Sequence, residues 1–127
     1  MRDLFDDEHE AFRESFASWV DNEVVPHYLE WEAEGIAPRS LYTSAGKYGF
    51  VGMQVPEAFG GGGSADFRFN QIIAEELAAK GIGGAGLGLT LHNDVTTPYF
   101  LEFADDEQQQ RWLPGIVTME KVASWAI

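Results

Sequence analysis

The sequence contains no cysteine among its 127 residues, and this absence removes two kinds of structure. Without cysteine there can be no disulfide framework and no thiolate metal site. Basic residues are also scarce, since eight Lys and Arg face 21 Asp and Glu, which gives a formal net charge of −13. Nucleic acids and anionic membranes are bound through clustered Lys and Arg, so we predict neither kind of partner.

Long apolar runs and targeting signals are missing too. No stretch approaches the roughly 20 apolar residues of a membrane span, so none is expected. The N-terminus becomes acidic at Asp3, whereas a secretory signal starts with basic residues and a transit peptide avoids acidic ones. We therefore expect a reducing cytoplasmic setting, or an equivalent compartment after processing. Apolar material is plentiful, because 45% of residues are hydrophobic, which suffices for the core of one domain.

Hydrophobic periodicity predicts a helix over residues 4–34. Pro26 cannot continue the backbone hydrogen bonds, so we expect a break there and about two further turns before Gly35. His9 stands among acidic residues, which predicts an exposed position. The apolar stripe of this helix consists of Phe5, Phe12, Phe16, Trp19, Val20 and Val24.

Three more helices are expected downstream. One is opened by Pro38 and closed by Gly49, and another spans roughly 65–80. The last begins near Asp105 and is broken near Pro114. Their apolar faces are predicted to comprise Leu41, Tyr42, Ala45 and Tyr48, then Phe69, Ile72, Ile73 and Leu77, and finally Trp112, Leu113 and Ile116.

Two glycine-rich stretches raise the question of phosphate binding. Residues 81–86 spell G-x-G-x-x-G, but a dinucleotide fingerprint needs a strand before it, and here it follows a predicted helix. We favour close helix packing, which small residues permit. Residues 60–63 are four consecutive glycines with no Lys in Walker spacing, so they predict a flexible loop.

Neither a catalytic centre nor a metal site is predicted. No Ser or Cys nucleophile motif is present, and Glu75 and Glu76 point to different faces of one helix. The paired Glu-x-x-His segments of a di-iron bundle are also missing. His92 differs from the other histidines because its surroundings are apolar, and the simpler role for it is a core or interface histidine with a satisfied ring.

Residues 122–127 have the composition of a strand. No other segment is a predicted strand, so this one has no partner for its backbone hydrogen bonds. Either it packs as an irregular tail or the natural protein continues past Ile127, and we favour the second interpretation.

Six motifs, taken in order, resemble the N-terminal domain of the acyl-CoA dehydrogenase family, with its long-chain enzymes nearest. They are FDDEHEAFR at 5–13, VVPH at 24–27, EWE at 30–32, PEAFGGGG at 56–63, EELA at 75–78 and EQQQRWLP at 107–114. The sequence departs from the family at 118–121, where glycine usually precedes the glutamate.

The resemblance implies an all-α, orthogonal bundle of about six helices over residues 1–120 and the first strand of a β-domain at 121–127. It implies a homotetrameric flavoprotein in which FAD binds between the β-domain and C-terminal helices. Such an enzyme desaturates an acyl-CoA and passes electrons to an electron-transfer flavoprotein or a similar acceptor. A C-terminal glutamate takes the α-proton and flavin N5 the β-hydride, so no catalytic residue is expected in this chain.

Two sets of site residues follow from the resemblance. Residues 122–127 resemble those before the flavin-contacting motif T-E-P-G-A-G-S-D, so Trp125 and Ile127 would flank the isoalloxazine. Residues 89–93 resemble the helix that closes the far end of the acyl pocket. The residues implied to bind substrate and set its chain length there are Leu91, His92 and Val95.

Other functions stay open at this level. Acyl-CoA oxidases and flavin-dependent monooxygenases share this N-terminal domain and differ in how the reduced flavin meets oxygen. A standalone helical interaction module without enzyme activity is a third possibility, which the unpaired terminal strand disfavours.

Overall fold

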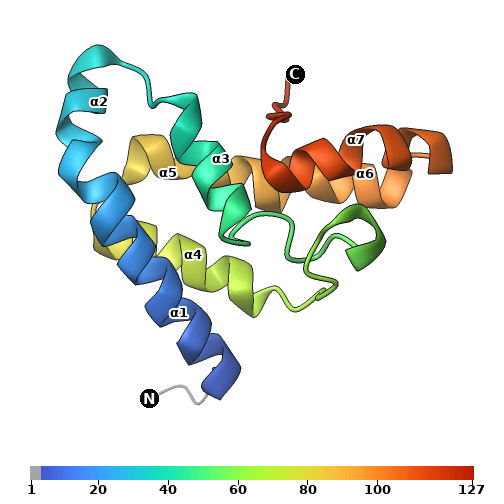
Figure 1. Cartoon of the computed structure of the whole chain (residues 1–127), viewed down its shortest axis with the longest axis horizontal. Helices are drawn as coiled ribbons and strands as arrows, with labels where there is room; N and C mark the ends of the chain where they lie inside the picture. Colours follow the sequence, from blue (N-terminus) through green and yellow to red (C-terminus); the bar gives the residue numbers. More distant parts are fainter. Residues whose placement is uncertain (1–3) are drawn as a thin grey trace.

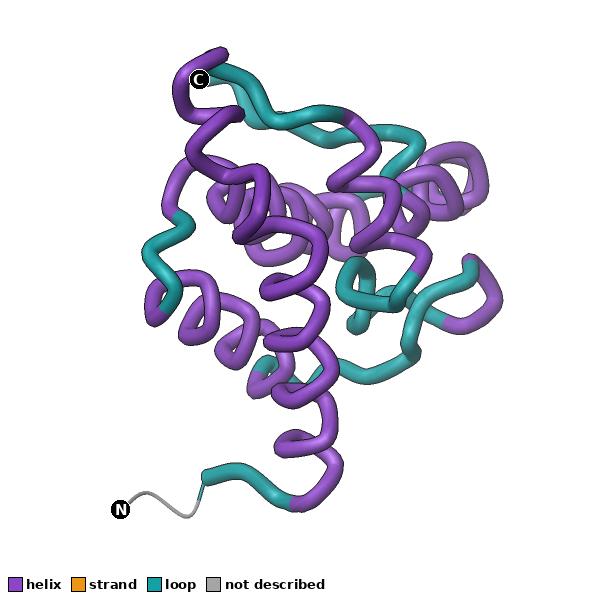
Figure 2. Tube along the Cα trace, turned by 60° about the vertical axis from the view of Figure 1, so that its left-hand side comes forward, coloured by secondary structure: helices purple, strands orange, loops and turns teal. Residues whose placement is uncertain are grey.

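The computed structural model describes residues 4–127, so the first three residues of the predicted domain 1–120 lie outside it. The predicted all-α class is confirmed, because every regular element in the described part is helical (Figures 1 and 2). None of the helices there is long and apolar enough to cross a membrane. The α-helices are α1 (Asp7–Trp19), α2 (Tyr28–Glu34), α3 (Arg39–Lys47), α4 (Arg68–Ala79), α5 (Gly83–Thr90), α6 (Thr97–Phe103) and α7 (Asp106–Thr118).

Shorter helical turns join some of these helices into longer runs. The π-helical η1 (Val20–Val24) and the 3-10 turn η2 (Val25–His27) connect α1 to α2. A second π-helical segment, η4 (Leu91–Thr96), connects α5 to α6, and η3 (Glu57–Phe59) is a 3-10 turn in the loop before α4. In Figure 1, α1 crosses α4 on one side of the molecule, while α6 and α7 lie side by side on the other.

The break predicted at Pro26 is a change of helix type. The Val25 N–H donates to Val20 O, five residues back, in the wider π-turn, and Pro26 then sits in the 3-10 turn η2. Because the helix widens before the proline, the chain passes it without leaving the helical region of backbone dihedral angles.

The break predicted at Pro114 is wrong, since α7 runs through it from Asp106 to Thr118. A proline inside a helix costs about 3 kcal/mol. Leu113, Ile116 and Val117 are buried on both sides of it, and each such side chain contributes about 1.5–3 kcal/mol. Burial therefore outweighs the lost hydrogen bond.

The larger core lies between α1, α3, α4 and α5. Phe16 is at its centre, and its ring centroid lies 5.6 Å from that of Trp19 and 5.0 Å from that of Phe50. Tyr48, predicted to be buried, is exposed near the end of α3, where it lies beyond the last turn. The buried members of this core are Phe16, Trp19, Val20, Val24, Leu41, Ala45, Phe50, Val51, Met53, Phe69, Ile73, Leu77, Ile82, Ala85, Leu89 and Met119.

His9 is not exposed as predicted, because its side chain is only 2% accessible. It stands four residues after Phe5 and three before Phe12, on the apolar stripe that faces α4. Its Nδ1 lies 2.7 Å from Asp6 Oδ1 and its Nε2 lies 3.0 Å from Asp66 Oδ2. Polar partners from two segments thus satisfy the buried ring.

Glycines let α5 approach its neighbours closely. A Cβ at Gly86 would lie 3.1 Å from Leu77 of α4, and one at Gly88 would lie 2.7 Å from the Tyr42 hydroxyl of α3. A Cβ at Gly84 would meet only the carboxylate end of Glu32 of α2, which can move. Close packing therefore accounts for Gly86 of the 81–86 motif, whereas Gly83 has open space beside it and Gly81 adopts a positive φ of +70°; no strand precedes the motif in the described chain.

Residues 121–127 form no strand here: residue 121 lies in a bend and residues 122–127 have no regular secondary structure. A strand needs a neighbouring strand as the partner of its backbone hydrogen bonds, and the described residues contain none. Whether this segment begins a β-domain stays a prediction.

Candidate functional site

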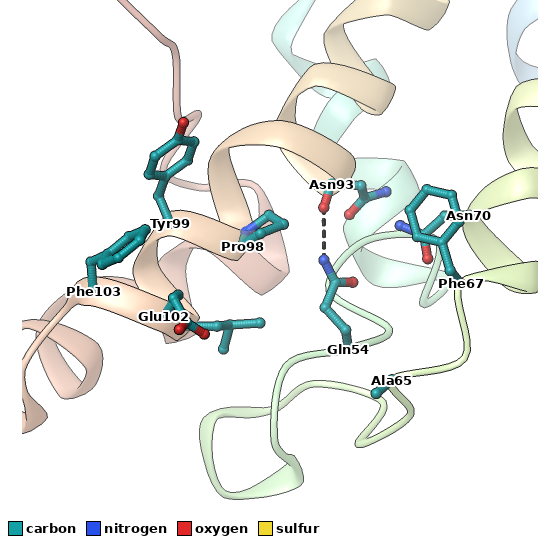
Figure 3. Close-up of a pocket in the computed structure, with 10 residues that line it drawn as sticks. Gln54, Ala65, Phe67, Asn70, Asn93, Pro98, Tyr99, Glu102 and Phe103 are labelled. Atoms are coloured by element: carbon teal, nitrogen blue, oxygen red, sulfur yellow. Dashed lines mark hydrogen bonds between the residues drawn. The ribbon is translucent and has the colours of Figure 1, made fainter.

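A hollow lies between the N-terminal end of α4, the loop before it and α6 (Figure 3). Its volume is about 630 Å³, within the range of cavities that hold small molecules. The lining is mainly apolar. It consists of Gln54, Ala65, Phe67, Asn70, Asn93, Pro98, Tyr99, Leu101, Glu102 and Phe103.

Three amide side chains, together with Tyr99 and Glu102, form the polar part of this cavity. Asn93 is buried, and its side chain accepts the Gly52 N–H at 3.0 Å and donates to Phe50 O at 2.9 Å. Asn70 donates to Asp94 Oδ1 at 2.6 Å. Asn93 therefore fixes the loop that forms one wall, and Asn70 joins α4 to η4.

The π-helical geometry of η4 connects this loop to the helix. In a π-turn a carbonyl accepts from the residue five positions on, which for Asn93 is Pro98, and proline has no N–H. Gln54 Nε2 takes that place and donates to Asn93 O at 2.7 Å, the dashed line in Figure 3. Gln54 Oε1 is buried and makes no hydrogen bond within the described residues. It is the free acceptor in the wall of the cavity.

Burial raises the pKa of Asp94, and the hydrogen bond from Asn70 opposes that rise. Asp94 does not line the cavity, and its carboxylate accepts the hydrogen bond from Asn70, which does. The cavity offers no Ser, Cys or His nucleophile. Its mainly apolar lining suits an apolar ligand.

None of the three residues predicted to bind the acyl chain lines this cavity. Leu91 and Val95 are half-buried on η4. His92 is 0% accessible, and its ring is held between two backbone groups. Nε2 lies 2.8 Å from Ile116 O, and the Ala123 N–H points to Nδ1 at 3.2 Å. Burial lowers the pKa of His92, and the bond to the Ile116 carbonyl opposes that shift.

The two residues predicted to contact flavin lie on the C-terminal segment. Trp125 is 52% exposed, and its ring centroid lies 5.5 Å from that of Tyr99, which lines the cavity. Ile127 is exposed. Trp125 thus contacts Tyr99, one of the lining residues, and neither Trp125 nor Leu91, His92 and Val95 line the cavity itself.

Sequence reasoning missed Gln54, Asn70 and Asn93. Asn70 stands at a buried position of the helix predicted over 65–80, next to Phe69, and Asn93 follows His92 in a segment rich in apolar residues, which is the signal that could have found these two. Gln54 was beyond reach, since its role depends on a π-turn and a proline about forty residues away.

The comparisons with known proteins agree with this architecture. The family model "Acyl-CoA dehydrogenase, N-terminal domain" matches residues 6–120. The mitochondrial long-chain specific acyl-CoA dehydrogenase of Sus scrofa is 37% identical over 127 residues, which cover 100% of this chain and 29% of that protein. This chain therefore spans about 29% of the length of that relative.

Solved structures show the same likeness. An acyl-CoA dehydrogenase from Geobacillus kaustophilus superposes with a TM-score of 0.90 at 38% identity, over 96% of this chain and 31% of that one. An acyl-CoA dehydrogenase from Bacillus anthracis, solved in complex with FAD, gives 0.79 at 26% identity, over 97% and 21%. By the match over residues 6–120, this chain belongs to the acyl-CoA dehydrogenase family and corresponds to its N-terminal domain.

Proposed function

We propose that this chain is the N-terminal helical domain of an FAD-dependent acyl-CoA dehydrogenase, which desaturates acyl-CoA thioesters in fatty-acid oxidation or related catabolism. The match of nearly the whole chain to that domain carries the proposal. In this assignment the catalytic base and the flavin's main contacts belong to other domains of the enzyme. Few basic residues are available for CoA phosphates, so other parts of the enzyme would hold the CoA end.

The proposed flavin contacts are Trp125 and Ile127. Both offer exposed apolar surface of the kind that packs on an aromatic ring system, and the ring of Trp125 lies beside Tyr99, which lines the cavity. FAD, when bound, would supply the hydride acceptor. The contribution of this chain would be to present one side of the site and to keep water from it.

The proposed acyl contacts are Leu91 and Val95, with His92 between them. The first two are half-buried on η4 and leave surface for an alkyl chain. His92 is enclosed, so any effect on chain-length preference would be indirect. One methylene is worth about 1–3 kcal/mol in such a pocket, enough to rank substrates by length.

The remaining parts of the proposal concern the setting. We propose an electron-transfer flavoprotein or similar acceptor, a homotetramer, and a cytoplasmic location, on the sequence arguments given above. The mammalian relatives are named as mitochondrial proteins, which is said of those proteins alone.

A first experiment uses the chain by itself. The purified chain should be colourless and should not reduce a dye in the presence of any acyl-CoA, because the flavin site needs two further domains. Absorbance near the flavin maximum, at one flavin per chain, would contradict the assignment.

A second experiment joins the chain to the rest of a known enzyme. Replacing the matching N-terminal segment of the Geobacillus kaustophilus acyl-CoA dehydrogenase with this chain should give a yellow protein that oxidises acyl-CoA. The unmodified enzyme is the control, and a panel of acyl-CoA lengths shows whether the domain shifts the preference. A folded chimera that retains neither flavin nor activity would overturn the proposed function.

A further inference from the structure

We propose that His92 is a positioning residue, whose ring ties the end of α7 and the C-terminal segment to η4 and thereby sets where Trp125 lies. The link to flavin rests on the proposed function. The tether itself does not, because it concerns contacts within this chain.

The two hydrogen bonds of the ring define one protonation state. Ile116 O can only accept, so Nε2 must carry the proton in the 2.8 Å contact. The Ala123 backbone nitrogen can only donate, so Nδ1 must be bare in the 3.2 Å contact. Only the neutral imidazole with its proton on Nε2 makes both bonds.

The surroundings hold the ring in place. His92 is fully buried, and its own carbonyl accepts the hydroxyls of Thr96 at 3.0 Å and Thr97 at 2.6 Å. These bonds fix the π-turn from which the side chain leaves. A fully enclosed ring with both nitrogens engaged has little freedom to move away from its partners.

The chain beyond α7 is tied down in two successive steps. Met119 adopts a left-handed conformation with φ of +56°, and the Lys121 N–H then donates to Gly115 O at 3.0 Å. Two residues later the Ala123 N–H reaches His92. In the described part of the chain, this is the last backbone group before the C-terminus with a hydrogen bond.

Trp125 follows two residues after that bond. Its ring packs against Tyr99, which lies two helical turns after His92 on the same run of helix. One helical run therefore holds the C-terminal segment at two points, through its backbone at Ala123 and through the ring of Trp125. The same run carries Leu91 and Val95, so the proposed acyl and flavin contacts share one support.

Two substitutions separate the two bonds of the ring. In His92→Gln the side-chain amide can reach the place of Nε2 and donate to Ile116 O, but nothing accepts the Ala123 N–H. In His92→Asn the shorter side chain can accept near the place of Nδ1 but does not reach Ile116. The pair therefore distinguishes the tether from the general effect of altering a buried residue.

The test is amide hydrogen exchange by NMR on the 127-residue chain. The Ala123 amide should exchange about 5-fold faster or more in His92→Gln, from the loss of one hydrogen bond, and should stay near the wild-type rate in His92→Asn. The Ile73 amide in α4 is the internal control for overall stability. Equal acceleration of Ala123 and Ile73 in His92→Gln would mean a structural role only and would overturn the proposal.

Two further readouts complete the test. Nitrogen-15 spectra should show the neutral Nε2–H form of His92, and the Nδ1–H form or a charged ring near neutral pH would overturn the tether. In the chimera, His92→Gln should retain flavin less well than His92→Asn, and equal retention would overturn the link to flavin. A wild-type chimera without flavin would instead count against the proposed function and leave the tether intact.

Discussion

The side of the molecule built from α1 and α4 and the side built from α6 and α7 use aromatic rings in opposite ways. On the first, rings are enclosed and contact one another, as in Phe16 with Phe50 at 5.0 Å and Phe12 with Phe69 at 5.1 Å. On the second, Phe103 is 75% exposed. The buried cluster of this second side is small and consists of Val55, Leu113, Ile116 and Val117. The difference teaches that stability is concentrated on one side, while the other leaves apolar surface for contact.

The strongest test of the difference between the two sides is to remove a large side chain from the core between α1 and α4. Phe16→Ala should lower the free energy of unfolding by about 3–5 kcal/mol, because a fully enclosed ring is replaced by a cavity. Urea unfolding followed by circular dichroism measures the loss. A cost below about 1 kcal/mol would mean that this core is not where the stability lies.

The second cluster should matter less. Leu113→Ala should cost about 2–3 kcal/mol, since Leu113 is fully buried but the small cluster around it can relax. Hydrogen exchange should show amides of α6 and α7 losing more protection than those of α1 and α4. A larger loss than that of Phe16→Ala would reverse the comparison.

Lowering the pH should reduce the stability of the side built from α1 and α4, because Asp66 becomes protonated. Hydrogen bonds from Arg68 hold the pKa of Asp66 well below its usual value of 3.8, and the bond to His9 acts in the same direction. A carboxyl whose pKa is lower in the folded state contributes stability above the unfolded value and loses it as the pH falls further. Asp66→Asn should be less stable than the wild type at about pH 7, and the gap should begin to narrow as the pH falls below about 3.8 and continue to narrow toward the lower pKa of the folded state. Urea midpoints across this range measure it, and a gap that stays constant with pH would contradict the assignment.

The smallest effect should come from the exposed ring on the second side. Phe103→Ser should change the free energy of unfolding by less than about 0.5 kcal/mol, because the side chain is mostly in water already. Binding of a fluorescent dye for apolar surface should fall. If stability dropped by more than about 1 kcal/mol, Phe103 would belong to the core, and the two sides would differ less than proposed.

Local patterns predicted most of the helices. The stripe from Phe12 to Val24 and the apolar face of α4 lie where their spacing placed them. The start of α7 follows from its capping residue, because Asp105 accepts the Gln108 N–H at 2.8 Å. Such features depend on residues within one or two turns, which the sequence displays directly.

Apart from Tyr48, which lies beyond the last turn of α3, the errors depend on distant residues. The acidic neighbours of His9 predict an exposed position, yet its ring is paired with Asp66, 57 positions away in the sequence. Pro114 was expected to break a helix that tertiary burial keeps intact. The bond between Gln54 and Asn93 needs a π-turn, a proline and a loop to meet in space. Hydrophobic periodicity gives no information on contacts between residues far apart in the sequence, so the cavity could not be predicted.

The four glycines of α5 bear on the order in which the molecule folds. Each glycine costs a helix about 1 kcal/mol relative to alanine, so this segment has little tendency to become helical alone. Its surroundings are supplied by α2, α3 and α4, whose side chains occupy the space beside Gly84, Gly86 and Gly88. We therefore expect α5 to form late, on a surface that the other helices have already built. In a refolding experiment with pulsed hydrogen exchange, its amides should gain protection after those of α1 and α4.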